Sequence, residues 1–364
     1  MSSTFGSNIR LTIFGQSHGE AVGMVLDGFP AGLDLDMERI AREMERRRPG
    51  RSPMATARRE DDLPHFVSGV FRGKTSGQPI CALIPSRDQH SQDYGEQVDV
   101  LRPSHADYTG HVRYYGYEDF RGGGSFSGRL TAPVVLAGTL CAMFLEKEGV
   151  QVQTHIRRIG GEEDISLADV PEDENLDMLR QMTLPVLKPE AGEAFRRIIE
   201  EASADRDSVG GEVEGRILGV PAGLGSPFFD SMESVLAHLF FSVPGVKGVS
   251  FGDGFALARM RGSRANDSFC LDGEKIRTRT NHAGGINGGI SNGMPILFTC
   301  AMRPTPSIAR KQETVSLKEG RECELEIHGR HDPCIVVRAV PVMEAMAWFG
   351  LMDLWKERKA CLGS

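Results

Sequence analysis

The chain has 364 residues, of which 40% are hydrophobic and 25% charged, the usual composition of a soluble globular protein. Its net charge of −8 argues against a generally basic nucleic-acid-binding protein, although it permits a local basic pocket. The seven scattered cysteines include no CxxC pair, which disfavours a structural zinc site and fits a reducing compartment. We see no apolar signal core and no apolar run near the ~18 residues of a membrane span, so we expect a cytoplasmic protein.

Five segments have helical spacing or helix boundaries. Met37, Ile40, Ala41 and Met44 share one face of a predicted helix that Asp36 can cap and Pro49–Gly50 can end. The other four predicted helices are residues 131–148 with Thr131 as cap, a segment from about Pro189, a segment from Ser231, and an amphipathic segment from Pro341 toward Arg358.

Short runs rich in β-branched residues, bounded by Gly or Pro, predict strands between these helices. They are residues 80–85, 212–221, 245–252, 294–302, 323–329 and 334–341. Because the order has no strict βαβ alternation, we predict an α+β fold with antiparallel sheets and helices packed on them. We expect one domain over residues 1–364, with residues 162–177 as an acidic surface excursion.

The segment "GQSHGE", residues 15–20, places Ser17 and His18 between two glycines after an apolar run. Two interpretations remain open: a turn at a strand end with an incidental histidine, or a loop that holds His18 against a ligand. Glycine clusters at 120–128 and 282–289 match no dinucleotide fingerprint, but such runs can turn backbone N–H groups toward an anion. "GVFRGKT", residues 69–75, is one residue too short for a phosphate loop and predicts a hairpin.

Several motifs combine arginine with histidine or hydroxyl groups. "RRRPGR" supplies Arg46, Arg47, Arg48 and Arg51, which can bind carboxylate and phosphate groups or form a solvated helix end. "RPSHADYTGH" sets Arg102 three residues before His105, "RPTPS" spans 303–307, and "GRHDP" spans 329–333. Together with the glycine clusters, these motifs predict a site for a polyanionic small molecule with a phosphorylated cofactor.

The ordered set of motifs resembles the chorismate synthase family from about Phe14 to Ala347. The matching motifs are "FGQSHG", "RRRPG", "RPSHADYT", "DFRGGGSFSGRLTA", "VKGVSFGDGF", "HAGGINGGISNGMPI", "RPTPSI" and "RHDPCIVVRAVPVMEAM". The resemblance implies a β-α-β sandwich, usually in a homotetramer. It also implies 1,4-anti elimination of phosphate from 5-enolpyruvylshikimate 3-phosphate to give chorismate, the last common step of aromatic amino acid biosynthesis. The family requires reduced FMN, with no net redox change.

The resemblance also implies roles for individual residues. His18, with Ser17 as helper, would donate to the leaving phosphate; His105 would lie by the flavin ring, and Asp332 would tune the flavin edge that takes the proton. The substrate-binding candidates are Arg47, Arg48, Arg102, Arg129 and Arg330. The FMN-binding candidates are Ser125, Phe126, Ser127, Pro244, Gly245, Gly288, Arg303, Pro304, Thr305, Pro306, Ser307 and Arg330.

Some positions depart from the family pattern. They are Gln16 for Glu, Ser104 for Gly, Ser125 for Arg, Leu130 for Glu, Arg303 for Lys, and Pro53 where a basic residue relevant to NADPH is frequent. We expect reduced FMN to come from an external reductant.

Two other functions are possible from the sequence. One is a flavin oxidoreductase with net electron transfer, which the missing Rossmann fingerprint disfavours. The other is an RNA- or anion-binding protein, which the net negative charge and the 7% aromatic content disfavour.

Overall fold

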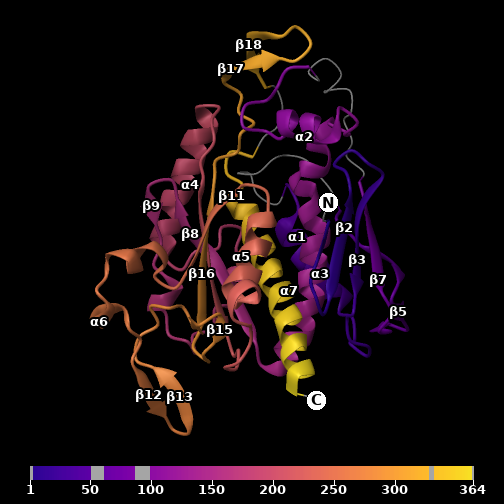
Figure 1. Ribbon diagram of the computed structural model, residues 1–364. Helices are drawn as coiled ribbons and strands as arrows, with labels where there is room; N and C mark the ends of the chain where they lie inside the picture. Colours follow the sequence, from indigo (N-terminus) through magenta and orange to yellow (C-terminus); the bar gives the residue numbers. More distant parts are fainter. Residues whose placement is uncertain (1–2, 51–60, 87–98, 328–331, 363–364) are drawn as a thin grey trace.

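The computed structural model describes residues 3–50, 61–86, 99–327 and 332–362. Two five-stranded antiparallel sheets enclose a layer of helices, as the two flanks of Figure 1 show. The first sheet has the order β1 (Thr4–Phe5), β2 (Arg10–Gly15), β3 (Ala21–Asp27), β7 (Ile80–Pro85), β4 (His65–Ser68). The second has the order β11 (Val246–Phe251), β16 (Ile296–Met302), β10 (Gly211–Leu218), β8 (Gln151–Ile159), β9 (Glu162–Glu163).

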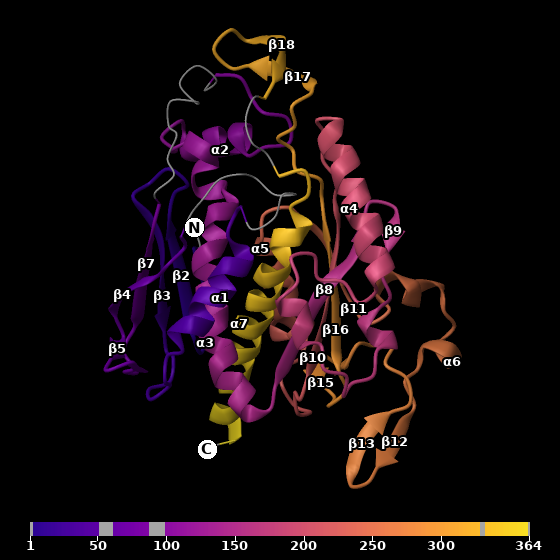
Figure 2. The same cartoon turned by 180° about the vertical axis from the view of Figure 1, so that it is seen from behind.

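The enclosed layer contains α1 (Met37–Arg47), α3 (Thr131–Leu145), α5 (Met232–Ser242) and α7 (Val336–Leu362). Seen from behind, α1 lies in front of α3 and α7, while α4 (Pro189–Ala204) lies on the far side of the second sheet (Figure 2). One hydrophobic core joins the inner faces of both sheets to these helices. The predicted α+β architecture with antiparallel sheets is confirmed.

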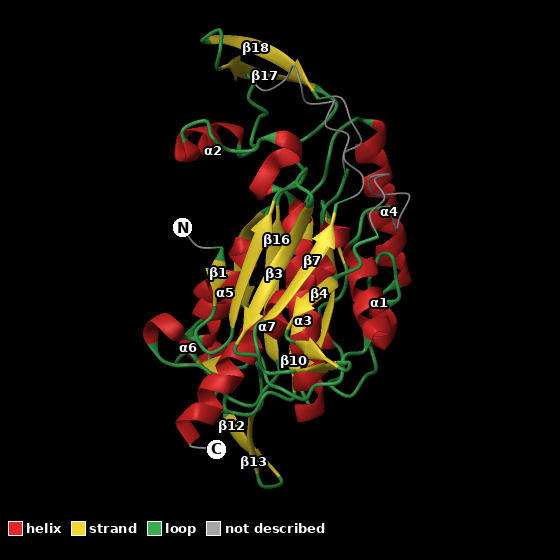
Figure 3. Cartoon of the chain, turned by 90° about the vertical axis from the view of Figure 1, so that its right-hand side faces the viewer, coloured by secondary structure: helices red, strands yellow, loops and turns green. Residues whose placement is uncertain are grey.

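The remaining elements are small and lie mostly at the ends of the sandwich. They are α2 (Asp107–Tyr114), α6 (Gly262–Ala265) and the hairpins β5 (Val70–Phe71)–β6 (Lys74–Thr75), β12 (Phe269–Asp272)–β13 (Lys275–Thr278), β14 (Ile286–Asn287)–β15 (Ile290–Ser291) and β17 (Lys311–Ser316)–β18 (Arg321–Glu326). Figure 3 shows α2 and the β17–β18 hairpin beyond one end of the strands. The β5–β6 hairpin confirms that "GVFRGKT" is no phosphate loop.

The predicted helix boundaries are largely confirmed. Asp36 caps α1 by accepting a hydrogen bond from Arg39 N at 2.8 Å, Ser231 caps α5, and α4 begins at Pro189. Thr131 is a correction: it is the first residue of α3, and its hydroxyl donates to Gly128 O instead of capping.

Helix α7 differs most from expectation. Residues 334–341 were predicted as a strand, but α7 begins at Val336 and continues through Pro341. The helix is also buried on every side from Ala339 to Trp355, so it is not amphipathic. It crosses α3 closely, since a Cβ atom at Gly138 would lie 2.5 Å from Ala345 Cβ. Burial between two sheets therefore overrides the β propensity of "IVV".

Helix α3 is the second central helix. Residues 121–148 are long and apolar enough to cross a membrane by composition alone, which corrects the expectation that no such run exists. However, 83% of the apolar window is buried inside the fold, so the run is explained by the central position of α3.

Candidate active site

Most of the motif-bearing loops that the structure describes lie at the end of the sandwich beside α2 and the β17–β18 hairpin (Figure 1). Strand β2 ends at Gly15, whose φ of +106° turns the chain toward Ser17 and His18. Ser17 N donates to Gly124 O at 3.1 Å, which joins this loop to the glycine cluster that follows α2.

Gly122 in that cluster faces the Ser17–His18 pair. A Cβ atom at Gly122 would lie 2.5 Å from His18 Nε2 and 2.9 Å from Ser17 Oγ, so a larger residue would displace the histidine. His18 is nearly buried, and Ser17 Oγ is buried with no hydrogen-bond partner in the part of the chain that the structure describes. Of the two interpretations of "GQSHGE", the structure therefore favours a loop that holds His18 in a set position beside an unsatisfied hydroxyl.

The glycine cluster itself forms an irregular turn, η2 (Arg121–Phe126), with positive φ at three successive glycines. Ser127 then caps a short turn by accepting a hydrogen bond from Arg129 N. Phe126 packs against α2, where a Cβ atom at Gly110 would lie 2.8 Å from its ring. The predicted FMN contacts Ser125, Phe126 and Ser127 thus lie on one turn that directly follows the His18 contact.

Two of the predicted substrate arginines share one carboxylate. Asp62 Oδ2 accepts from Arg47 Nη2 at 2.8 Å, and Oδ1 is bound to Arg129 Nη1. Burial lowers the pKa of Arg47 to about 10 despite the attraction of Asp62, so this arginine stays charged at neutral pH. Burial also raises the pKa of Asp62, but Arg47 and Arg129 outweigh it and hold that pKa below its ordinary value. Arg47 Nε is buried without a hydrogen-bond partner among the residues that the structure describes.

The other predicted substrate arginines are also paired. Arg102 makes a bidentate pair with Asp107, with Nε and Nη2 at 2.8 and 2.6 Å from its oxygens, and so braces the start of α2. Arg48 is partly exposed and pairs with Glu45 at 2.9 Å. Arg330 lies outside the described residues, as does Pro53.

Asp332 is held by an arginine that the sequence analysis did not single out. Arg338 Nη1 donates to Asp332 Oδ2 at 2.5 Å, and Arg338 Nε donates to Arg47 O at 3.2 Å. The next residue, Pro333, accepts from Val209 N at 2.8 Å. Asp332 is therefore fixed between the end of α1 and the start of β10.

The "RPTPS" segment completes the same region. His105 Nε2 lies 2.8 Å from Ser307 Oγ, and Ser208 Oγ donates to Thr305 O at 2.6 Å. Thr305 Oγ1 is buried and has no hydrogen-bond partner within residues 3–50, 61–86, 99–327 and 332–362. Pro304 and Pro306 flank this threonine, and Arg303 N donates to Gly245 O at 2.9 Å, which places Pro244–Gly245 beside the segment.

Gly288 is the exception among the described candidates. It lies in the turn between β14 and β15, near the beginning of β16, whereas Arg303 follows the end of that strand. Seven extended residues span about 20 Å, so within one chain Gly288 lies far from Thr305 and Ser307. Its role in FMN binding stays a prediction.

Three residues at the site were missed in the sequence: Asp62, Asp107 and Arg338. Each holds a residue that had been predicted. Asp107 stands two residues after His105 in the sequence, and Asp62 ends the short acidic run of residues 60–62. No local pattern indicated Arg338, because its segment was taken for a strand.

The site fits a phosphorylated, anionic ligand set. Three buried polar atoms that have no hydrogen-bond partner in the described ranges belong to predicted site residues: Ser17 Oγ, Arg47 Nε and Thr305 Oγ1. Buried polar groups are normally satisfied, so these three mark where ligand atoms can bind. Ser127, Thr305 and Ser307 supply hydroxyls of the kind that bind an FMN phosphate.

Comparisons with known proteins agree with this geometry. The sequence profile of the family described as chorismate synthase matches residues 9–355. A chorismate synthase of Korarchaeum cryptofilum is 46% identical over 354 residues, 96% of each chain. One of Thermococcus gammatolerans is 45% identical, covering 98% of this chain and 99% of the relative. A chorismate synthase crystal structure superposes with a TM-score of 0.78 at 30% identity, covering 97% of this chain and 93% of that one.

Proposed function

Because the chain belongs to the chorismate synthase family, we propose that it converts 5-enolpyruvylshikimate 3-phosphate to chorismate by 1,4-anti elimination of phosphate. The enzyme class of the family is a carbon–oxygen lyase acting on phosphates. The observation that carries the proposal is that Ser17 Oγ, Arg47 Nε and Thr305 Oγ1 are buried without a hydrogen-bond partner among the described residues. All three belong to residues that the family motifs predict to bind ligands.

The substrate carries one phosphate and two carboxylates, so its site needs several cations in a shielded place. Arg47 and Arg129, held by Asp62, supply two buried guanidinium groups. Arg48 and Arg102 are further candidates, and Arg330 stays a prediction from the motif. Each described cation already has a carboxylate partner, which fixes its direction before the substrate arrives and reduces the entropy lost on binding.

We infer that His18 donates a hydrogen bond or proton to the departing phosphate. Negative charge grows on the bridging oxygen as the C–O bond breaks, and a donor fixed at that oxygen stabilises the transition state more than the ground state. The close contact of Gly122 supports this role, because it limits the freedom of the His18 ring. Ser17 Oγ, buried beside it, is a second donor.

Reduced FMN, when bound, supplies electron density to the breaking C–O bond and takes up the substrate proton. His105, joined to Ser307, would face the flavin ring, and Asp332, held by Arg338, would orient near its edge. Ser125, Phe126, Ser127, Pro244, Gly245 and residues 303–307 would form the binding surface. An external reductant would provide the reduced flavin, and NADPH contact at Pro53 stays open to test.

We further propose a cytoplasmic homotetramer in which residues 1–364 form one domain. The core shared by both sheets supports the single domain. Large exposed aromatic side chains support assembly, because such groups are typical of subunit interfaces; they are Phe228, Phe229, Phe241 and Phe255. Light scattering coupled to gel filtration tests the oligomeric state, and a monomer at micromolar concentration would overturn it.

A flavin absorbance titration tests whether both ligands share this site. Under anaerobic conditions, reduced FMN is added to the protein alone and then with 5-enolpyruvylshikimate 3-phosphate or a non-reacting analogue. We expect a spectral change that is larger with the second ligand. If the analogue does not change the absorbance spectrum of bound FMN, the two ligands do not share a site.

A further inference from the structure

We propose that Asp62 is a positioning residue for the anion site: its carboxylate holds Arg47 and Arg129 in the arrangement that receives the substrate's anionic groups. The inference rests on the proposed function and assigns a role to a residue outside the predicted site. Its side chain is fully buried, and it lies between two guanidinium groups from different parts of the chain.

The contacts of the three side chains leave little freedom. Asp62 uses one oxygen for each arginine, at 2.8 Å from Arg47 Nη2 and in direct contact with Arg129 Nη1. Arg47 Nη1 also donates to Gly128 O at 3.2 Å, and Arg129 Nη2 donates to Pro85 O at 3.1 Å. With these nitrogens engaged, Arg47 Nε is a buried donor without a partner among the described side chains and backbone.

The charges explain why the carboxylate is needed. Two guanidinium groups that touch one carboxylate lie close enough to repel each other strongly in a buried place. Asp62 offsets that repulsion and leaves the cluster with one net positive charge. Because both arginines keep the pKa of Asp62 low, the carboxylate stays ionised at neutral pH. Removing it would leave two buried cations without their common partner.

A position-setting role and a purely electrostatic role predict opposite results. If Asp62 acted only as a counter-charge that competes with anions, its removal would strengthen anion binding. If it positions the arginines, its removal lets them separate and weakens anion binding, although the site becomes more positive. The sign of the change in anion affinity therefore decides between them.

Inorganic phosphate is the probe, measured by calorimetric titration of the full-length protein. We expect Asp62→Asn to weaken phosphate binding at least about tenfold. We also expect Asp62→Glu, which keeps the charge but moves the carboxylate, to weaken it by a smaller factor. In turnover assays, the KM for the substrate should rise more than kcat falls. Asp164→Asn is the matched control, since Asp164 is another buried carboxylate, bound to Leu187 N and Lys188 N away from the site.

The control should lower the melting temperature and leave phosphate binding unchanged. Phosphate binding that is unchanged or stronger in Asp62→Asn would overturn the inference. If Asp62→Asn does not fold, phosphate binding that is unchanged in Asp62→Glu would overturn it. No phosphate binding by the wild-type protein also counts against it. The proposed function is tested separately from this inference. If phosphate binding depends on Asp62 but the wild-type protein makes no chorismate, the inference about Asp62 holds and the lyase activity is rejected.

Discussion

His105 Nε2 lies 2.8 Å from Ser307 Oγ, although the two residues are 202 positions apart. The β17–β18 hairpin brings them together. Leu101, just before the histidine motif, donates its N–H to Val315 O on β17, and Ser307 lies shortly before that strand begins. Strand β17 therefore links both sides of the contact: it pairs with the segment before His105, and it follows the segment that carries Ser307.

This contact predicts that both side chains matter for flavin binding. His105→Ala should weaken FMN binding and alter the flavin spectrum, and Ser307→Ala should weaken binding by a smaller factor because it removes one hydrogen bond, worth about 1 kcal/mol. Fluorescence titration with FMN measures both. His111→Ala, an exposed histidine on α2, is the control. Wild-type FMN affinity in His105→Ala would refute the role at the flavin.

Gly122 and Gly123 offer a matched pair. Both have positive φ, so Gly→Ala strains the backbone at each site, but a Cβ atom meets His18 only at position 122; at position 123 its nearest neighbour is Ser127 Cβ at 3.8 Å. We expect Gly122→Ala to lower kcat at least about tenfold more than Gly123→Ala, measured at a temperature at which both variants are folded. Equal kcat values in the two variants would show that His18 need not be held in place.

His18→Ala should lower kcat by about 10²–10³-fold, the usual effect of removing a donor to developing negative charge. FMN affinity should remain close to that of the wild type, because His18 faces the substrate phosphate in our account. His65→Ala, an exposed histidine on β4, serves as the control in steady-state assays. If kcat is retained in His18→Ala, another group donates to the phosphate.

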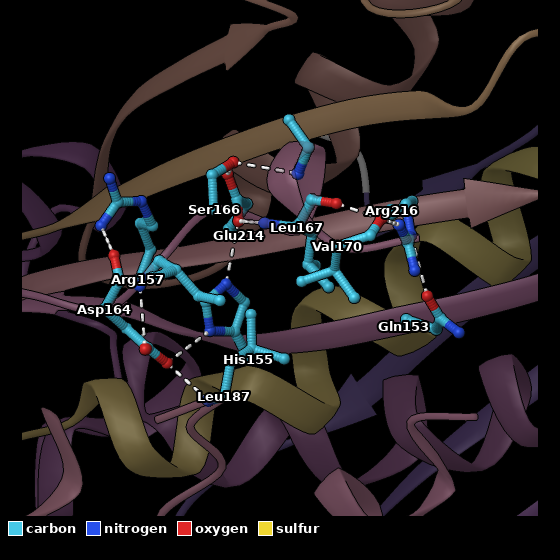
Figure 4. A network of polar contacts seen from close by, with 12 residues as sticks. Gln153, His155, Arg157, Asp164, Ser166, Leu167, Val170, Leu187, Glu214 and Arg216 are labelled. Carbon is cyan, nitrogen blue, oxygen red and sulfur yellow. Dashed lines mark hydrogen bonds and ion pairs between the residues drawn. The ribbon is translucent and has the colours of Figure 1, made fainter. Parts of the chain in front are cut away.

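His155 predicts a pH-dependent stability away from the active site. Its Nε2 lies 2.9 Å from Glu214 Oε2 and its Nδ1 lies 3.3 Å from Asp164 Oδ2, on the outer face of β8 and β10 (Figure 4). Burial lowers the pKa of His155, but the bonds to Asp164 and Glu214 outweigh it and raise the pKa above its ordinary value. The same contacts overcome burial and lower the pKa of both carboxylates.

A raised histidine pKa stabilises the fold fully below about pH 6.5, and this stability is lost as pH rises through the folded-state pKa. The depressed carboxylate pKa values add stability that is lost in acid. We expect the free energy of unfolding of His155→Gln to lie furthest below the wild type near pH 6, with the difference shrinking toward pH 9. Urea titrations across this range measure it. A difference that does not change with pH would show that His155 is neutral in the fold.

The elements predicted correctly from the sequence are those whose caps, apolar pattern and end residues agree with their burial in the fold. Helix α1 has a cap, an apolar stripe and a Pro-Gly end, and it was located correctly. Strand β8 was missed because His155 and Arg157 interrupt its apolar residues; the excursion that follows β9 covers the histidine, which no local pattern reveals. The start of α7 was assigned to a strand because its burial between two sheets is a tertiary property.

The candidate site also divides into residues that a sequence motif marks and residues whose role depends on tertiary contacts. The motifs predicted His18, His105, Asp332 and the arginines as site residues, and their individual roles rest on the family resemblance. The partners that orient them, Asp62 and Arg338, come from segments whose contacts form only when the chain folds. Gly288 shows the converse: its cluster suggested a ligand contact, yet within one chain β16 lies between it and the remaining candidates.

The most direct test is an anaerobic assay of purified protein with 5-enolpyruvylshikimate 3-phosphate and a catalytic amount of reduced FMN. Phosphate release and chorismate absorbance are followed together. We predict equal amounts of both products, in large excess over the flavin, with no net consumption of reductant. Absence of phosphate release, or consumption of one reductant equivalent per turnover, would contradict the proposed lyase.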